Sequence, residues 1–159
     1  MLVEAQSLAV NPGESVSTTI MLDNKGVLDD RCQIKITGIP EEWVALSPSV
    51  TTLQPGSQQE VQLTIQPPLS PQSRAGRHSL AVQVISEHGS KQIDQIRKVL
   101  IIAPYSQATS TLWPQEISTG QVSQMTIENH GNTTETFTIR PKPDGALKFQ
   151  PEENRLKLN

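Results

Sequence analysis

Hydrophobic and polar residues alternate along several short stretches of this chain. The clearest stretch is Glu60 to Gln66, where Val61, Leu63 and Ile65 alternate with polar residues. This period of two is typical of a strand with one buried face. The same pattern predicts further strands at residues 2–10, 16–22, 31–37, 78–86 and 93–103. No stretch has the periodicity of an amphipathic helix, so the pattern predicts an all-β protein.

Residues that favour turns separate the predicted strands, as at Asn11-Pro12-Gly13, at Pro55-Gly56 and in the loop 69–77. About seven strands in roughly 100 residues, with turns about every 8–12 residues, is the pattern of an immunoglobulin-like β-sandwich. We expect Trp43 to close the core at one edge. The run 99–102 is apolar on both faces, so we expect it to be covered on both sides or to lie near a neighbouring domain.

The second part of the chain repeats the first. Thr18 to Gly26 reads Thr-Thr-Ile-Met-Leu-Asp-Asn-Lys-Gly, and Ser123 to Gly131 reads Ser-Gln-Met-Thr-Ile-Glu-Asn-His-Gly. The matches continue in the same frame and then with a shift of two residues: Cys32 with Phe137, Ile34 with Ile139, Leu46–Pro48 with Phe149–Pro151, and Leu53 with Leu156.

This repeat predicts two domains. Residues 1–103 form an immunoglobulin-like β-sandwich, and residues 104–159 form the N-terminal half of a second, incomplete one. Half a sandwich leaves sheet edges and one core face uncovered. We therefore expect a fragment of a longer multidomain protein, whose other domains are its partners. The alternative is that another protein, or a second copy, completes the half module through its exposed sheet edges.

The span from Gly38 to Gln83 carries motifs of a known family. These are Gly38-Ile-Pro-Glu-Glu-Trp43, Ser47-Pro48, Leu53-Gln-Pro-Gly56, Val61-Gln-Leu-Thr-Ile65 with Pro67-Pro68, and Ala75-Gly76 before Leu-Ala-Val-Gln-Val. They resemble the bacterial immunoglobulin-like modules of the NPCBM-associated type. The Asn24-Lys-Gly26 and Asn129-His-Gly131 turns resemble that family's Asn-x-Gly turn. The resemblance implies a spacer, docking surface or ligand binder in a glycosidase or cell-envelope protein. In the second copy Pro143-Asp144-Gly145 replaces the motif that holds Trp43.

Charge and hydropathy exclude several classes of partner. The chain has 13 basic and 16 acidic residues, a net charge of −3 and no run of one sign, which argues against nucleic-acid binding. No window approaches the ~18 apolar residues of a membrane span. The first residues lack the basic start and apolar core of a signal peptide. A native start at Met1 would indicate the cytoplasm, whereas a fragment would favour the cell envelope or secretion.

Residues able to support catalysis or bind a metal do not form a recognisable motif. Cys32, the single cysteine, lies in phase with Ile34 and Ile36 and is expected to be a buried, inert thiol. The remaining candidates lie at a strand start and in turns, without the spacing of a metal site: His78, His88, His130, Asp23, Asp29 and Asp30. We therefore predict no catalytic residue, no metal, no cofactor and no enzyme activity.

Two aromatic residues near the domain boundary, Tyr105 and Trp113, are the candidate contacts for a partner or ligand. Aromatic residues make up only 3% of the chain, so a platform of several exposed rings is not expected. We predict a non-enzymatic structural or spacer module of a larger bacterial envelope or secreted protein. The alternative is a carbohydrate- or protein-binding module that acts through loop ends or an exposed sheet edge.

Overall fold

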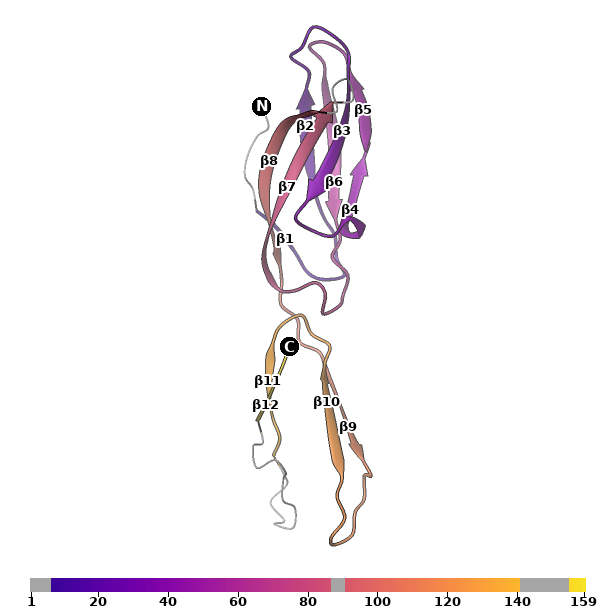
Figure 1. Cartoon of the computed structure of the whole chain (residues 1–159), viewed down its shortest axis with the longest axis vertical. Helices are drawn as coiled ribbons and strands as arrows, with labels where there is room; N and C mark the ends of the chain where they lie inside the picture. Colours follow the sequence, from indigo (N-terminus) through magenta and orange to yellow (C-terminus); the bar gives the residue numbers. More distant parts are fainter. Residues whose placement is uncertain (1–6, 87–90, 141–154) are drawn as a thin grey trace. The chain divides into compact units, whose positions relative to one another are not determined.

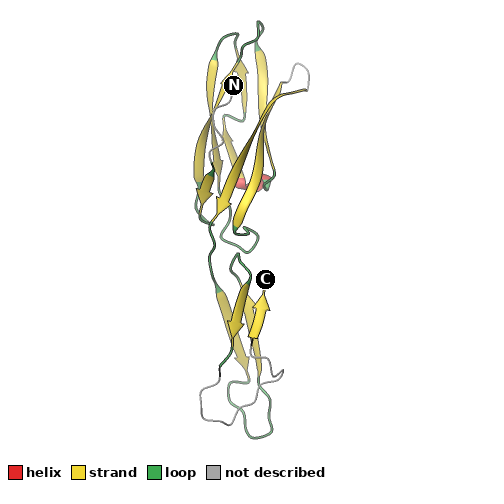
Figure 2. Ribbon diagram, turned by 90° about the vertical axis from the view of Figure 1, so that its left-hand side faces the viewer, coloured by secondary structure: helices red, strands yellow, loops and turns green. Residues whose placement is uncertain are grey.

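The computed structural model describes residues 7–86, 91–140 and 155–159. The chain divides into two compact units (Figure 1). The N-terminal unit comprises Met1–Leu69 and Ala75–Ala103, and the C-terminal unit comprises Ser70–Arg74 and Pro104–Asn159. In the described part of the chain, strands dominate and no helix is long and apolar enough to span a membrane (Figure 2).

The N-terminal unit is a sandwich of two sheets. One has five strands in the order β1-β8-β7-β3-β5, and the other has three in the order β2-β6-β4. Their bounds are Leu8–Val10 for β1, Val16–Asp23 for β2, Asp30–Thr37 for β3, Val44–Ser47 for β4, Val50–Leu53 for β5, Gln58–Ile65 for β6, Gly76–Ser86 for β7 and Lys91–Ile102 for β8. All pairs are antiparallel except β1 with β8. The predicted all-β, immunoglobulin-like fold is confirmed.

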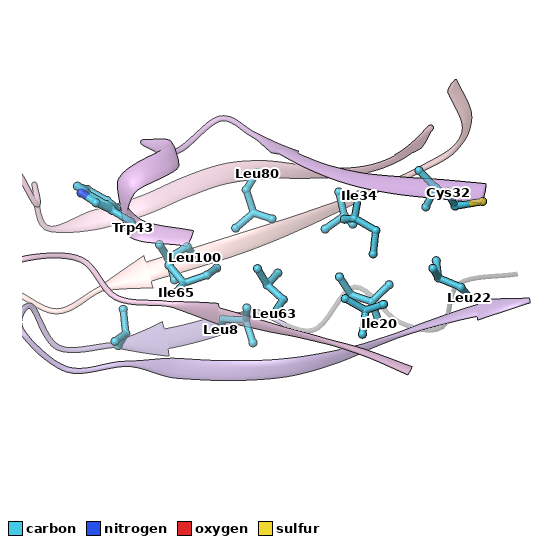
Figure 3. Packing of buried hydrophobic residues seen from close by; sticks show 14 of the residues in the cluster. Leu8, Ile20, Leu22, Cys32, Ile34, Trp43, Leu63, Ile65, Leu80 and Leu100 are labelled. Carbon is cyan, nitrogen blue, oxygen red and sulfur yellow. The ribbon is translucent and has the colours of Figure 1, made fainter. Parts of the chain in front are cut away.

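The inward-facing residues of both sheets form one hydrophobic core (Figure 3). The alternation that predicted β6 places Val61, Leu63 and Ile65 at 0% exposure. Trp43 is the last residue of the short 3-10 turn η1 (Glu41–Trp43) and lies at one end of the labelled cluster (Figure 3). It is 7% exposed, which confirms the prediction that it closes the core. Its carbonyl accepts a hydrogen bond from the Gln66 amide at 2.8 Å.

The structure bears on two further expectations, for β1 and for the apolar run in β8. The predicted strand 2–10 is observed as β1, Leu8–Val10, while residues 1–6 lie outside the described residues. In the apolar run 99–102 of β8, Leu100 and Ile102 are buried but Val99 and Ile101 are half-buried. Complete cover of both faces is therefore not observed, because the second sheet covers only the inward face of β8. The alternative, that this run lies near a neighbouring domain, stays a prediction.

Gly38 joins β3 to η1 in a conformation that requires glycine. Its φ is +96°, in the left-handed region that side chains rarely adopt. A Cβ atom there would lie 2.3 Å from the Ser79 carbonyl oxygen of β7. The glycine of the Gly38-Ile-Pro motif is thus explained by backbone packing.

The described part of the C-terminal unit forms two separate two-stranded sheets. In one sheet β9 (Ala108–Trp113) pairs antiparallel with β10 (Gln124–Asn129). In the other, β11 (Glu135–Thr138) pairs antiparallel with β12 (Arg155–Leu158). The predicted match of Leu46–Pro48 with Phe149–Pro151, and the Pro143-Asp144-Gly145 segment, lie outside the described residues.

Candidate functional site

A buried asparagine closes the turn between β2 and β3 in the N-terminal unit. The Asn24 side-chain oxygen accepts a hydrogen bond from the Gly26 amide at 2.9 Å. Its Nδ2 donates to the carbonyls of Leu28 and Leu53, both at 2.9 Å. Asn24 therefore links the turn to β5 as well as holding the turn itself.

The turn between β10 and β11 in the C-terminal unit has the same hydrogen bonds. The Asn129 oxygen accepts from the Gly131 amide at 3.0 Å. Its Nδ2 donates to the carbonyl of Thr133 at 2.8 Å and to that of Leu158 at 3.3 Å. Each of these residues stands 105 positions after its N-terminal counterpart. The Asn-x-Gly signal in the sequence thus corresponds to one hydrogen-bonding arrangement in both units.

Strand pairing corrects one detail of the predicted repeat. In the N-terminal unit Asp30 lies opposite Leu53, and in the C-terminal unit Glu135 lies opposite Leu158. The counterpart of Leu53 is therefore Leu158, and the predicted match with Leu156 is wrong. A two-residue shift keeps a side chain on the same face of a strand, so the sequence pattern alone could not distinguish the two.

An open groove of about 350 Å³ lies between the two sheets of the C-terminal unit. β10 and β11 contribute most of its apolar lining, and β9 contributes small and polar residues. The lining residues are Ala108, Thr109, Ser110, Met125, Ile127, Phe137, Thr138, Ile139 and Arg140. We name this feature the β10–β11 groove.

The apolar residues of the β10–β11 groove have buried counterparts in the N-terminal core. In the frame of the two asparagine turns, the pairs are Met125 with Ile20, Ile127 with Leu22, Phe137 with Cys32, and Ile139 with Ile34. The four N-terminal residues are 2–5% exposed, whereas Met125 is 42% exposed. Complete burial of one aliphatic side chain contributes about 1.5–3 kcal/mol. The groove therefore holds apolar surface whose burial would be favourable.

Strand pairing explains why the same face is closed in one unit and open in the other. In the N-terminal unit β6 pairs with β2 and places Val61 beside Ile20. There β7 pairs with β3 and places Val84 beside Ile34. In the described part of the C-terminal unit, β10 pairs only with β9, and β11 pairs only with β12. Among the described residues of this unit, no strand takes the positions that β6 and β7 have in the N-terminal unit.

Tyr105, one of the two predicted contact residues, is held within the C-terminal unit. Its hydroxyl donates to the His130 carbonyl at 2.9 Å, and its amide donates to the Asn132 side-chain oxygen at 2.8 Å. Asn132 is 2% exposed, and its Nδ2 donates to the Ser73 carbonyl at 2.8 Å. A Cβ on Gly131 would lie 2.7 Å from the Tyr105 carbonyl. These contacts anchor the segment that leads into β9.

Trp113, the other predicted contact, is the last residue of β9 and is 78% exposed. The structure does not bring it together with Tyr105, because Tyr105 precedes β9 and Trp113 ends it, and a strand of this length spans roughly 17 Å at about 3.3 Å per residue. Leu112 beside it is 44% exposed. Trp113 therefore presents a large apolar surface on the C-terminal unit.

A cavity of about 290 Å³ lies at the end of the N-terminal sandwich beside the Asn24 turn. Cys32 forms part of its wall and is 2% exposed, as predicted. Burial, together with the negative charge and hydrogen bond of Asp30, raises the pKa of the Cys32 thiol to about 11. The thiol is therefore a poor nucleophile near neutral pH.

Acidic residues beside this cavity already form an ion pair or a hydrogen bond within the protein. Asp23 forms an ion pair with Lys25 at 3.8 Å, and Asp30 accepts a hydrogen bond from Ser86 at 2.6 Å. Within residues 7–86, 91–140 and 155–159, no group of three His, Cys, Asp or Glu residues is arranged to hold a metal ion.

The sequence analysis missed one buried charged residue, Lys98 of β8. Lys98 is 6% exposed and its Nζ lies 3.5 Å from the Thr18 hydroxyl on the other sheet. Its position in phase with Leu100 was the available signal, since residues two apart in a strand face the same side. The groove residues were missed for another reason: their openness depends on which strands pair.

Comparison with known families gives one match. A family model described as Cep192 domain 3 matches residues 2–90. This family is not the NPCBM-associated type that the sequence motifs resemble. The match therefore supports the predicted immunoglobulin-like module but not the predicted family. No curated protein is significantly similar to the chain in sequence.

Solved structures with a similar fold come from several organisms. SSP-19, an MSP-domain protein from Caenorhabditis elegans, is 15% identical with a TM-score of 0.40, and the match covers 61% of this chain and 94% of that one. The PapD-like domain 7 of human CEP192 is 17% identical with a TM-score of 0.41, covering 65% and 82%. A CsuC–CsuE chaperone–adhesion subunit complex of Acinetobacter baumannii is 14% identical with a TM-score of 0.47, covering 99% and 85%.

Proposed function

The chain belongs to the Cep192 domain 3 family, and from this premise we propose that it is a non-enzymatic structural module of a larger multidomain protein. The observation that carries this proposal is the closed core of the N-terminal unit. Among the residues that the structure describes, sixteen hydrophobic side chains are buried in one cluster. In the described part of the chain, no buried side-chain nitrogen or oxygen lacks a hydrogen-bond partner. Such a sandwich would hold the domains attached at its two ends at a fixed distance from each other.

We further propose that residues 104–159 are the first half of a second sandwich of the same kind. The repeated asparagine turn supports this domain division, because four positions make equivalent hydrogen bonds in each unit. The parent protein is proposed to be bacterial and to lie in the cell envelope or outside the cell. That part of the proposal rests on the sequence motifs between Gly38 and Gln83.

A thermal-shift screen of the full chain tests the structural role. The panel comprises glycans, nucleotides and divalent cations, together with turnover assays on glycoside and ester substrates. A ligand present at 100 times its dissociation constant stabilises a protein by about 2.7 kcal/mol, which a melting curve detects. We expect no saturable shift and no turnover. A saturable shift that a substitution in one loop abolishes would replace the structural role with a ligand-binding one.

A protein-binding module is the second candidate function, and the open β10–β11 groove favours it. We propose Trp113 as a contact residue and Tyr105 as a residue that positions β9. Trp113→Ala should leave the melting temperature unchanged, since the ring is 78% exposed, but weaken capture of a partner by the immobilised chain. Equal capture by the wild-type chain and the variant would remove Trp113 from the contact surface.

A further inference from the structure

We propose that the outer face of the five-stranded sheet binds an extended acidic segment of a partner protein. The segment lies along β7, and its carboxylates pair with Arg77, Arg97 and Lys35. All three basic residues belong to the N-terminal unit. The inference therefore goes beyond the structural role and is independent of the β10–β11 groove.

Charged residues are sorted between the two faces of this sheet. Lys35, Arg77 and Arg97 are exposed and stand out of phase with the buried residues of their strands, so they lie on the outer face. The acidic residues in the described part of the five strands are Asp30 and Asp94. Both are in phase with buried residues and so lie on the core side. The outer face is therefore basic, although the whole chain has a net charge of −3.

The three basic side chains flank β7, the middle strand of the group. β3 and β8 are its two neighbours (Figure 1). Arg97 of β8 lies opposite Ala81, and Lys35 of β3 lies opposite the residue two positions further along β7. Ser79 and Ala81, which face outward on β7 beyond Arg77, have small side chains. A chain laid along β7 can therefore approach the sheet closely. Within the described residues, none of the three basic side chains forms an ion pair.

The spacing of the basic residues matches that of an extended chain. Along β7, Arg77 stands four residues before the position beside Arg97 and six before the position beside Lys35. These separations are roughly 13 and 20 Å at about 3.3 Å per residue. Side chains on one face of an extended peptide recur every two residues, so positions i, i+4 and i+6 of the segment face the three basic residues. Position i+2 faces Ser79 and its half-buried neighbour Val99, which favours an aliphatic residue there.

A short acidic segment fits this face better than a nucleic acid or a membrane does. In the described part of the five strands there is no aromatic residue on which a base could stack. DNA and anionic membranes are large enough to experience the whole chain, whose net charge of −3 repels them. Charges on exposed groups are largely screened beyond about 8 Å at physiological ionic strength. A short segment on this face therefore experiences mainly the basic residues around it.

A second copy of the chain does not supply the required segment. No two acidic residues of the sequence are two positions apart, whereas the spacing requires acidic residues at i+4 and i+6. The three-stranded sheet of a second copy offers only Asp23 and Glu60, and Asp23 already forms an ion pair with Lys25 at 3.8 Å. The proposal therefore commits to a segment of a different protein.

Peptide titration of the full chain tests the proposal. The probes are the labelled peptide Glu-Thr-Val-Thr-Glu-Thr-Glu and its reverse sequence, because the ion pairs fix the spacing but not the direction. The control, Glu-Glu-Glu-Val-Thr-Thr-Thr, has the same composition. At low salt, where screening is weak, fluorescence anisotropy should show saturable binding of one probe below about 1 mM and at least about fivefold weaker binding of the control. Absence of saturation, or equal binding of the control, would overturn the proposal.

Charge reversal localises the site. Arg97→Glu and Lys35→Glu should each weaken the probe at least about threefold, because each removes an exposed ion pair and adds a repulsion. Arg97→Lys keeps the charge and should retain most of the affinity. Lys25→Glu is the matched control, since it makes the same change in net charge at a side chain that is 72% exposed and lies in the turn after β2. Equal weakening by Lys25→Glu would attribute binding to net charge and overturn the proposal.

Two other ligands separate the remaining polyanions. A short DNA duplex and vesicles of anionic phospholipid are titrated under the same conditions, and both should bind more weakly than the probe. Tighter binding of either one that Arg97→Glu abolishes would assign the face to that ligand and overturn the proposed partner. The substituted side chains are exposed, so every variant should keep the wild-type unfolding transition. The structural role therefore stands or falls separately with its own ligand screen.

Discussion

Replacement of Asn24 by alanine tests whether the asparagine turn stabilises the N-terminal sandwich. The substitution removes three hydrogen bonds, each at 2.9 Å, to Gly26, Leu28 and Leu53. A hydrogen bond contributes about 0.5–1.5 kcal/mol net, and a buried carbonyl left without a partner costs about 1–3 kcal/mol. The Leu53 carbonyl is buried at this bond. The expected loss in the free energy of unfolding is therefore about 2–4 kcal/mol.

The expected change in melting temperature follows from the size of the unit. For a domain of roughly 60–100 residues, 1 kcal/mol corresponds to about 4–8 °C. Asn24→Ala should therefore lower the midpoint by at least about 8 °C. Asn24→Asp should lower the midpoint at least as much, because a carboxylate cannot donate hydrogen bonds to the Leu28 and Leu53 carbonyls.

Tryptophan fluorescence can report on the N-terminal unit alone. The chain has two tryptophans: Trp43 is 7% exposed in the core, and Trp113 is 78% exposed in the other unit. In a Trp113→Phe background, urea unfolding followed by emission reports only on the Trp43 environment. Asn129→Ala, the equivalent change in the C-terminal unit, is the matched control and should not alter this transition.

Two results would refute this reasoning. A loss below about 0.5 kcal/mol for Asn24→Ala would mean that water or local rearrangement replaces the three hydrogen bonds. A change in the Trp43 transition of similar size for Asn129→Ala would mean that the two turns do not act on separate units.

Three further substitutions or treatments probe the N-terminal unit. Gly38→Ala should lower the free energy of unfolding by more than about 2 kcal/mol, measured in urea, because its Cβ would lie 2.3 Å from the Ser79 carbonyl at a φ of +96°. Cys32 should resist thiol reagents at pH 8 until the chain unfolds, since burial raises its pKa to about 11. Lys98→Met should raise the melting temperature, because it replaces a buried ammonium held only weakly, at 3.5 Å from Thr18.

Each of these predictions has a control and a contradicting result. Gly56→Ala also has a positive φ, +71°, but its Cβ meets nothing within 4 Å, so it should cost less than Gly38→Ala; an equal cost would attribute both to φ alone. For Cys32, stability should fall as the pH rises from about 9 to about 11, because the unfolded thiol ionises first. Reaction of the native thiol as fast as in urea would contradict its burial. A lower melting temperature for Lys98→Met would mean that the ammonium stabilises the core.

Local pattern was sufficient to predict the strands and much of the core. Side chains alternate across a strand whatever its partners are, so Val61, Leu63 and Ile65 could be assigned to one face from the sequence. The same period of two predicted that Cys32 faces inward. Trp43 was assigned to the core because it is the large apolar residue of the Gly38-Ile-Pro-Glu-Glu-Trp43 motif. The Asn-x-Gly repeat also appeared in the sequence, although its bonds to β5 and β12 did not.

Tertiary structure decided the features that depend on pairing between distant segments. The register of β12, with Leu158 rather than Leu156 opposite Glu135, follows from backbone hydrogen bonds that a period-two pattern cannot fix. Lys98 is buried because β2, in the other sheet, lies across from β8. Tyr105 forms its hydrogen bonds because the turn that begins at Asn129 folds back beside it. Met125 and Ile127 have the pattern of core residues, yet they line an open groove because no described strand takes the place of β6 there. The sequence alone determines which residues can be buried, whereas burial itself requires a second surface, and only the folded chain shows where that surface is present.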